Sequence, residues 1–147
     1  MPELIFLIGI SGSGKSTFAS QMRHIQIVSS DSIREELFGY ESIQANPGKV
    51  FDIAHKRVRH FLESGMDVIF DATNVSAFAR NSLLSFIRDV PCKKTCVFFS
   101  TTPEVALERQ KMRSRQVPEE AIRRQYDTLL NEANDIPLLF DKLVISA

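Results

Sequence analysis

Gly9-Ile10-Ser11-Gly12-Ser13-Gly14-Lys15-Ser16 is the stretch that decides the fold of this 147-residue chain. Its spacing is G-x-x-x-x-G-K-[ST], in which the glycines let backbone N–H groups come close to phosphate oxygens. In this pattern the lysine reaches the β- and γ-phosphates of a nucleoside triphosphate, and the hydroxyl of the last residue binds Mg²⁺. We therefore predict an ATP–Mg²⁺ site made by Gly9, Ser11, Gly12, Ser13, Gly14, Lys15, Ser16 and Thr17.

The residues on either side of this stretch have the context that the motif requires. Leu4–Ile8 is a continuous apolar run, typical of a buried parallel strand. Residues 17–22 can continue as a helix whose N-terminus faces the anion. A glycine-rich turn with a chance lysine would not be expected to have both flanks, so the sequence favours a phosphate-binding loop.

The remaining chain alternates predicted strands and helices, which indicates one α/β domain over residues 1–147. Three layers, α/β/α, with a five-stranded parallel sheet are expected. The strands are predicted at 4–8, 26–29, 67–70, 95–99 and 141–145. The helices are predicted at Ser32–Phe38, from Asn46-Pro47 to Gly65, from Ser76, from Thr102 to about Met112, and from Pro118. The loop-like stretch Tyr40–Gly48 is a candidate mobile segment over the site.

The composition is that of an ordinary globular protein, with 44% hydrophobic and 24% charged residues and a net charge of zero. A general nucleic-acid coat protein would be more basic, so any nucleic-acid substrate is expected to be held locally, at an end. Cys92 and Cys96 lack a second pair or a nearby His that would complete a metal site, which favours plain buried or edge-strand thiols. Neither a secretory signal nor a membrane span is recognised, so a cytoplasmic location without membrane contact is expected.

Ligands on a parallel sheet bind at the carboxyl ends of the strands, and Asp31 follows the second predicted strand. A carboxylate there could take the proton of an acceptor hydroxyl, and Arg34, one helical turn later, could bind an anionic group of the acceptor. Alternatively, Ser30 or Asp31 caps the helix that starts at Ser32. Both roles can belong to one residue.

A second polar segment, Asp71-Ala72-Thr73-Asn74, follows the apolar run Val68–Phe70. An Asp at the end of such a strand holds Mg²⁺, directly or through water, in enzymes with this phosphate loop. Thr73 and Asn74 add short polar groups suited to an acceptor. The alternative for this segment is an Asx turn that leads into a capped helix.

A basic segment at Arg109–Pro118 lies between two predicted helices, where a hinged lid would be. Arg109 and Arg113 are four residues apart, so they share a helix face and repel each other unless an anion lies between them. Phosphoryl transfer uses such arginines to stabilise the transferring group. A solvated basic helix end is the alternative.

Four ordered blocks together resemble the phage-type polynucleotide 5′-hydroxyl kinases and the wider family of small P-loop kinases. The blocks are Gly9–Thr17, Ser30–Arg34, Asp71–Asn74 and Arg109–Pro118, and the resemblance extends from residue 4 to about 145. It implies a P-loop kinase fold with a helical lid at about 109–118. It also implies that Asp31 is the general base, Arg34 contacts the acceptor's phosphate, Asp71 organises the strand end, Arg113 contacts the transferring phosphate and Arg109 lies nearer the nucleotide.

The leading hypothesis is an ATP- and Mg²⁺-dependent kinase whose acceptor is a nucleic-acid 5′-hydroxyl. A small-molecule kinase shares every feature except the acceptor, which would be a sugar, nucleoside or other hydroxylated compound. A third hypothesis is a nucleotide-binding switch or ATPase, for which Asp31 and paired lid arginines are unnecessary. The oligomeric state does not follow from the sequence.

Overall fold

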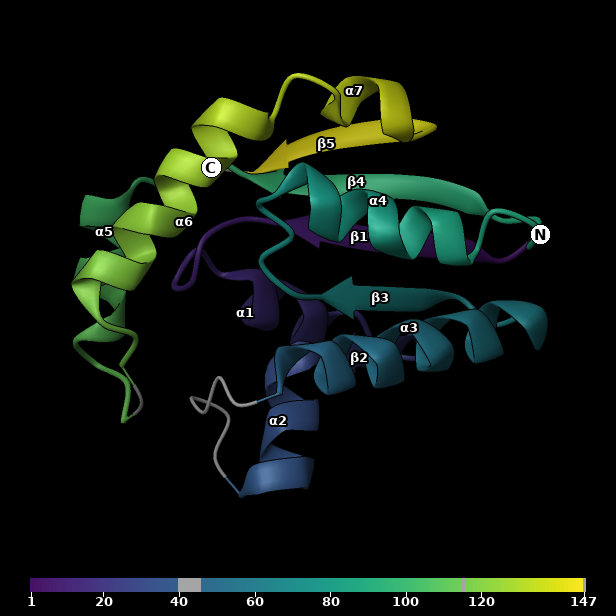
Figure 1. Ribbon diagram of the computed structural model, residues 1–147, viewed down its shortest axis with the longest axis horizontal. Helices are drawn as coiled ribbons and strands as arrows, with labels where there is room; N and C mark the ends of the chain where they lie inside the picture. Colours follow the sequence, from purple (N-terminus) through teal and green to yellow (C-terminus); the bar gives the residue numbers. More distant parts are fainter. Residues whose placement is uncertain (40–45, 115, 147) are drawn as a thin grey trace.

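The computed structural model describes residues 1–39, 46–114 and 116–146, so most of the stretch 40–48 lies outside the described residues. Its elements run in the order β1 (Glu3–Ile8), α1 (Lys15–Gln21), β2 (Gln26–Ser29), α2 (Ser30–Phe38), α3 (Pro47–Glu63), β3 (Val68–Asp71), α4 (Ala77–Phe86), β4 (Lys93–Phe99), α5 (Pro103–Gln110), α6 (Glu119–Glu132), α7 (Ile136–Leu139) and β5 (Lys142–Ser146). Figure 1 shows the carboxyl ends of the strands pointing toward α6.

The five strands form one parallel sheet in the order β2-β3-β1-β4-β5. β1 is central and pairs with β3 and β4, which explains why Leu4–Ile8 is apolar at every position. The loops after β2 and β3 therefore lie on one side of the phosphate loop that follows β1, and the loop after β4 lies on the other. The predicted α/β fold is confirmed, and each predicted strand lies within two residues of an observed one.

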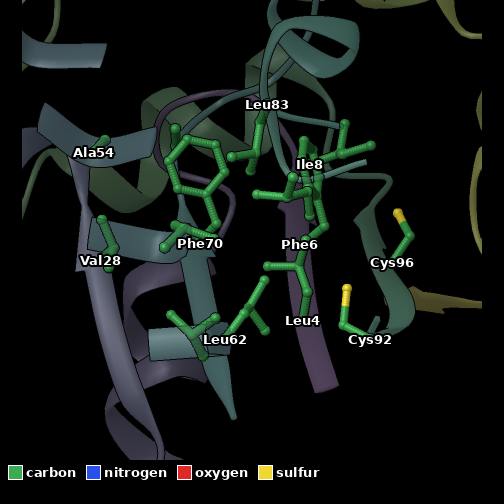
Figure 2. Packing of buried hydrophobic residues seen from close by; sticks show 14 of the residues in the cluster. Leu4, Phe6, Ile8, Val28, Ala54, Leu62, Phe70, Leu83, Cys92 and Cys96 are labelled. Atoms are coloured by element: carbon green, nitrogen blue, oxygen red, sulfur yellow. The ribbon is translucent and has the colours of Figure 1, made fainter. Parts of the chain in front are cut away.

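Alternate residues of the strands pack into two separate clusters, one on each face of the sheet. Phe6 and Phe70 meet edge-to-face, with ring centroids 5.6 Å apart, in the cluster beneath α3 and α4 (Figure 2). On the opposite face Ile5 and Leu7 pack with Ala19 of α1. Each fully buried Phe stabilises the fold by about 3–5 kcal/mol relative to Ala, and helices on both faces give the expected three layers.

The helix boundaries correct several expectations. α2 begins at Ser30, two residues early, because Ser29 is its cap: the Ser29 hydroxyl accepts a hydrogen bond from Ser32 N at 3.2 Å. α5 ends at Gln110 rather than near Met112. Asn46, a residue type that commonly caps helices, precedes α3 in the left-handed conformation and makes no side-chain cap bond. The short helix α7 was not predicted.

Candidate active site

A cleft of about 1020 Å³ lies over the carboxyl ends of the strands. It is bounded by the phosphate loop, the start of α2, the loop after β3, and the segment that joins α5 to α6. Twelve of the predicted site residues line it, namely Ser11, Gly12, Gly14, Lys15, Ser16, Thr17, Asp31, Arg34, Asp71, Thr73, Arg109 and Arg113. Residues from four distant blocks of the sequence therefore share one cavity.

The phosphate loop is shaped by glycines that cannot be replaced without strain. Gly12 has a φ of +82°, and a Cβ there would lie 2.9 Å from the Ala106 carbonyl oxygen of α5. Gly14 has a φ of +97° and immediately precedes α1. This backbone leads into the N-terminus of α1, where unpaired N–H groups and the helix dipole favour a bound anion.

Lys15 and Ser16 lie at the start of α1, inside the cleft. Lys15 is buried, and its Nζ donates to the Ile10 carbonyl oxygen at 2.9 Å. The Ser16 hydroxyl donates to Asp71 Oδ2 at 2.9 Å. The strand-end carboxylate and the loop hydroxyl, 55 residues apart in sequence, are thus in direct contact.

The Ser16–Asp71 pair fits the cofactor that the motif implies. Mg²⁺ prefers hard oxygen ligands and is commonly bound through one or two carboxylates or hydroxyls together with substrate phosphates and water. Ser16 and Asp71 are such an oxygen donor set, next to the loop that would hold the phosphates. Ser16 and Asp71 therefore remain the residues predicted to hold Mg²⁺.

Burial raises the pKa of Asp71, and the nearby negative charge of Asp31 acts in the same direction, while Lys15 and the Ser16 hydroxyl oppose the rise. Since the folded-state pKa exceeds the unfolded value, the ionised Asp71 carboxylate costs stability at neutral pH. That cost disappears as the pH falls below the ordinary value for Asp.

We expect Asp71→Asn to unfold at a temperature equal to or above that of the wild type at pH 7, although phosphoryl transfer falls. The difference in unfolding temperature should shrink toward zero near pH 3, where both chains are neutral at this position. Thermal unfolding across pH measures it, with Asp127→Asn on the exposed face of α6 as control. A clear drop in the variant's unfolding temperature at pH 7 would show that Asp71 stabilises the fold.

Asp31 and Arg34 form an ion pair within α2. Arg34 Nη1 donates to Asp31 Oδ1 at 2.8 Å, and the guanidinium carbon lies 5.7 Å from the centre of the Phe51 ring. Arg34 is buried, whereas Asp31 is partly exposed in the cleft. The prediction that Asp31 or Ser30 caps the helix is wrong, because Ser29 does so; Asp31 lies within the first turn.

Thr73 and Asn74 both lie in the loop after β3 and were both predicted to face an acceptor, but only Thr73 lines the cleft. Thr73 lines the cleft, and its carbonyl oxygen accepts a hydrogen bond from Gly9 N at 3.0 Å. Asn74 is buried, and its Nδ2 donates to the Leu7 carbonyl oxygen at 2.7 Å. Asn74, Gly9 and Ser13 lie outside the cleft lining, so their placement fits a structural role in holding the loops together.

The two arginines of the predicted lid, Arg109 and Arg113, differ in their contacts. Arg109, near the end of α5, donates to the Ser13 carbonyl oxygen at 3.1 Å, whereas Arg113 is exposed beyond the helix end. The side-chain amide of Gln110 connects the end of α5 to the residues just before α6. It donates to the Val117 carbonyl oxygen at 2.8 Å and accepts from Val117 N at 2.9 Å. Both arginines line the cleft.

Two residues that connect α6 to the site, Gln125 and Arg80, were not predicted from the sequence. Gln125 accepts from Ser11 N at 2.7 Å and donates to Ser11 Oγ at 3.1 Å, so α6 is fixed to the phosphate loop. Arg80 is completely buried and donates to the carbonyl oxygens of Asn74, Val75 and Glu132 and to Asp135. The signal for Gln125 was helical spacing, because Ala121, Gln125 and Thr128 share the face that lines the cleft.

The two cysteines are free and buried, as predicted, and burial raises the pKa of the Cys96 thiol to about 12.

Among the described residues, none of the helices has the length and apolar character needed to cross a membrane.

Comparison with known proteins places this arrangement in a family. The sequence model of AAA_33, described as an AAA domain, matches residues 4–132. The chain belongs to the AAA_33 family. The match includes every predicted site residue, and it confirms the resemblance drawn from the four sequence blocks.

One curated relative of this AAA_33 chain is a putative bifunctional polynucleotide kinase/RNA ligase of Autographa californica nuclear polyhedrosis virus, 28% identical over 148 residues. The alignment covers 90% of this chain but only 21% of the relative. A chain in the structure of the Pnkp1/Rnl/Hen1 RNA repair complex superposes with a TM-score of 0.80 and 23% identity, over 91% of this chain and 46% of that one.

A gluconokinase from Sinorhizobium meliloti 1021 shares the fold as well, with a TM-score of 0.67 and 18% identity, over 98% of this chain and 81% of that one. The chain described here spans less than half the length of both the viral relative and the chain in the RNA repair complex.

Proposed function

We propose that this chain is an ATP- and Mg²⁺-dependent kinase that transfers the γ-phosphoryl group of ATP to the 5′-hydroxyl of a nucleic-acid end. The observation that carries this proposal is the convergence in one cleft of Lys15, the Ser16–Asp71 pair, and Asp31 paired with Arg34. The polynucleotide kinase named in the viral relative supports the choice of acceptor. A switch protein would have no need of the Asp31–Arg34 pair.

In the proposed reaction Asp31 accepts a hydrogen bond from the acceptor hydroxyl and takes its proton as the oxygen attacks phosphorus. A new O–P bond forms, the bond between the γ-phosphorus and the bridging oxygen breaks, and ADP leaves. Lys15 and Arg113 stabilise the negative charge on the transferring oxygens. Mg²⁺, held by Ser16 and Asp71, would supply further neutralisation of phosphate charge.

A phosphorylated small molecule is the second candidate product, because the gluconokinase fold covers this chain almost completely. The two proposals differ in what Arg34 would bind. A buried guanidinium beside the base suits a phosphate or carboxylate on the acceptor and has little to offer a neutral sugar.

The test is incubation of the chain with γ-labelled ATP and Mg²⁺ in parallel with 5′-hydroxyl DNA, 5′-hydroxyl RNA, gluconate and a mixture of nucleosides. We expect label on one or both nucleic acids. Label on a small molecule alone would establish the second candidate, and hydrolysis that no hydroxyl compound stimulates would overturn both.

A further inference from the structure

The cleft has a positive charge that the whole chain lacks. Five cationic side chains line it against two carboxylates, Asp31 and Asp71, although the net charge of the chain is zero. Four of these cations are the sequence-predicted Lys15, Arg34, Arg109 and Arg113. The fifth is Arg124 of α6, to which no role has been given.

Arg124 differs sharply from its neighbour Arg123 on the same helix. The Arg123 guanidinium is engaged outside the cleft by Glu119 and Glu104, at 2.8 and 3.2 Å. Arg124 lines the cleft, and within the described ranges 1–39, 46–114 and 116–146 no carboxylate pairs with it. A guanidinium that faces a cavity in this way is suited to bind a phosphate.

The contacts of α6 run from the phosphate loop to the segment that follows β3, and Arg124 lines the cleft between them. Gln125, the next residue, is bonded to Ser11, and Glu132 near the end of α6 accepts from Ala77 N at 2.9 Å, beyond the loop after β3. Figure 1 shows α6 crossing the carboxyl ends of the strands. Arg109 lies on the other side of the phosphate loop, beside Thr101 after β4.

We infer that Arg124 is a second acceptor-binding residue, which contacts a backbone phosphate of the nucleic-acid strand from the wall opposite Arg34. This inference rests on the proposed function and makes it more specific. Arg34 binds the phosphate next to the reacting nucleoside, and Arg124 binds a further one. A strand with several phosphodiesters is therefore a better acceptor than a nucleoside 3′-monophosphate, which offers a single phosphate.

The test compares Arg124→Gln with Arg123→Gln, adjacent substitutions that remove the same charge. We expect Arg124→Gln to raise the KM for a 5′-hydroxyl oligonucleotide at least about tenfold, with the KM for ATP unchanged. For a nucleoside 3′-monophosphate the KM should change little. The slope of log KM against log salt should also fall by about 0.7, the contribution of one phosphate on a single strand.

Arg123→Gln should behave like the wild type in every assay, and thermal unfolding checks that both variants fold. Equal KM values for the oligonucleotide in the two variants would overturn the inference. A raised KM for ATP, or a fall in kcat alone, would overturn it too, by assigning Arg124 to the donor or to the transferring group. Failure of the wild type to label any nucleic acid would instead contradict the proposed function.

Discussion

Asp31→Asn is expected to lower the rate of phosphoryl transfer by about 10²–10⁴-fold, the range that general-base catalysis contributes. Asparagine has nearly the same shape and can still accept a hydrogen bond from Arg34 at the position of Oδ1. It cannot take a proton from an acceptor hydroxyl. Because Lys15, Ser16 and the phosphate loop are unchanged, the Kd for ATP should stay within about twofold of the wild type.

The measurement is single-turnover transfer from γ-labelled ATP, together with ATP binding by calorimetry. Asp52→Asn is the matched control, since Asp52 is an exposed residue of α3 that pairs with Lys56 at 2.9 Å, and it does not line the cleft. Ser29 still caps α2 in Asp31→Asn, but the buried Arg34 guanidinium loses a charged partner, so the unfolding temperature should fall and both variants are assayed well below it. Near-normal transfer by this variant would remove Asp31 as the base.

Arg80→Met is expected to lower the free energy of unfolding by about 3–5 kcal/mol, because several acceptors lose their donor and each unsatisfied buried group costs about 1–3 kcal/mol. The Arg80 guanidinium joins the loop after β3 to the end of α6 through three carbonyl oxygens and Asp135. Methionine fills part of the space but leaves the buried Asn74 carbonyl oxygen and three partly buried acceptors without this donor. Since domains are stable by only about 5–15 kcal/mol, this loss is large.

Urea unfolding compares Arg80→Met with the control Arg88→Met, which removes an exposed arginine just beyond the end of α4. Arg80→Lys supplies a milder change, which keeps the charge but loses the planar fork, and it should fall between wild type and Arg80→Met. Stability of both Arg80 variants within about 0.5 kcal/mol of the wild type would contradict this role.

Much of the fold was predictable because its signals are local. Leu4–Ile8 and Val68–Phe70 are apolar at every position, as central parallel strands require. The phosphate loop and the strand-end Asp71 have fixed positions relative to those strands, so their meeting in the cleft follows from the topology.

The contacts that sequence did not reveal depend on packing between distant elements. Arg80 and Arg124 each lie in an ordinary helical pattern, where an arginine usually faces solvent. One is buried by the end of α6, and the other faces the cleft because Gln125 fixes the helix against Ser11. Asn74 has the residue type of an acceptor ligand, but its amide donates to the backbone of β1.

The most direct test of phosphoryl transfer to a nucleic-acid end is the chemical position of the label. A 5′-hydroxyl oligonucleotide and the same oligonucleotide with a 5′-phosphate are incubated with γ-labelled ATP, the chain and Mg²⁺, and are then digested to nucleoside 5′-monophosphates. We expect label in the 5′-terminal mononucleotide of the 5′-hydroxyl strand alone, and loss of that label with Asp31→Asn. Unlabelled strands, with ATP hydrolysis that proceeds at the same rate with or without them, would contradict it.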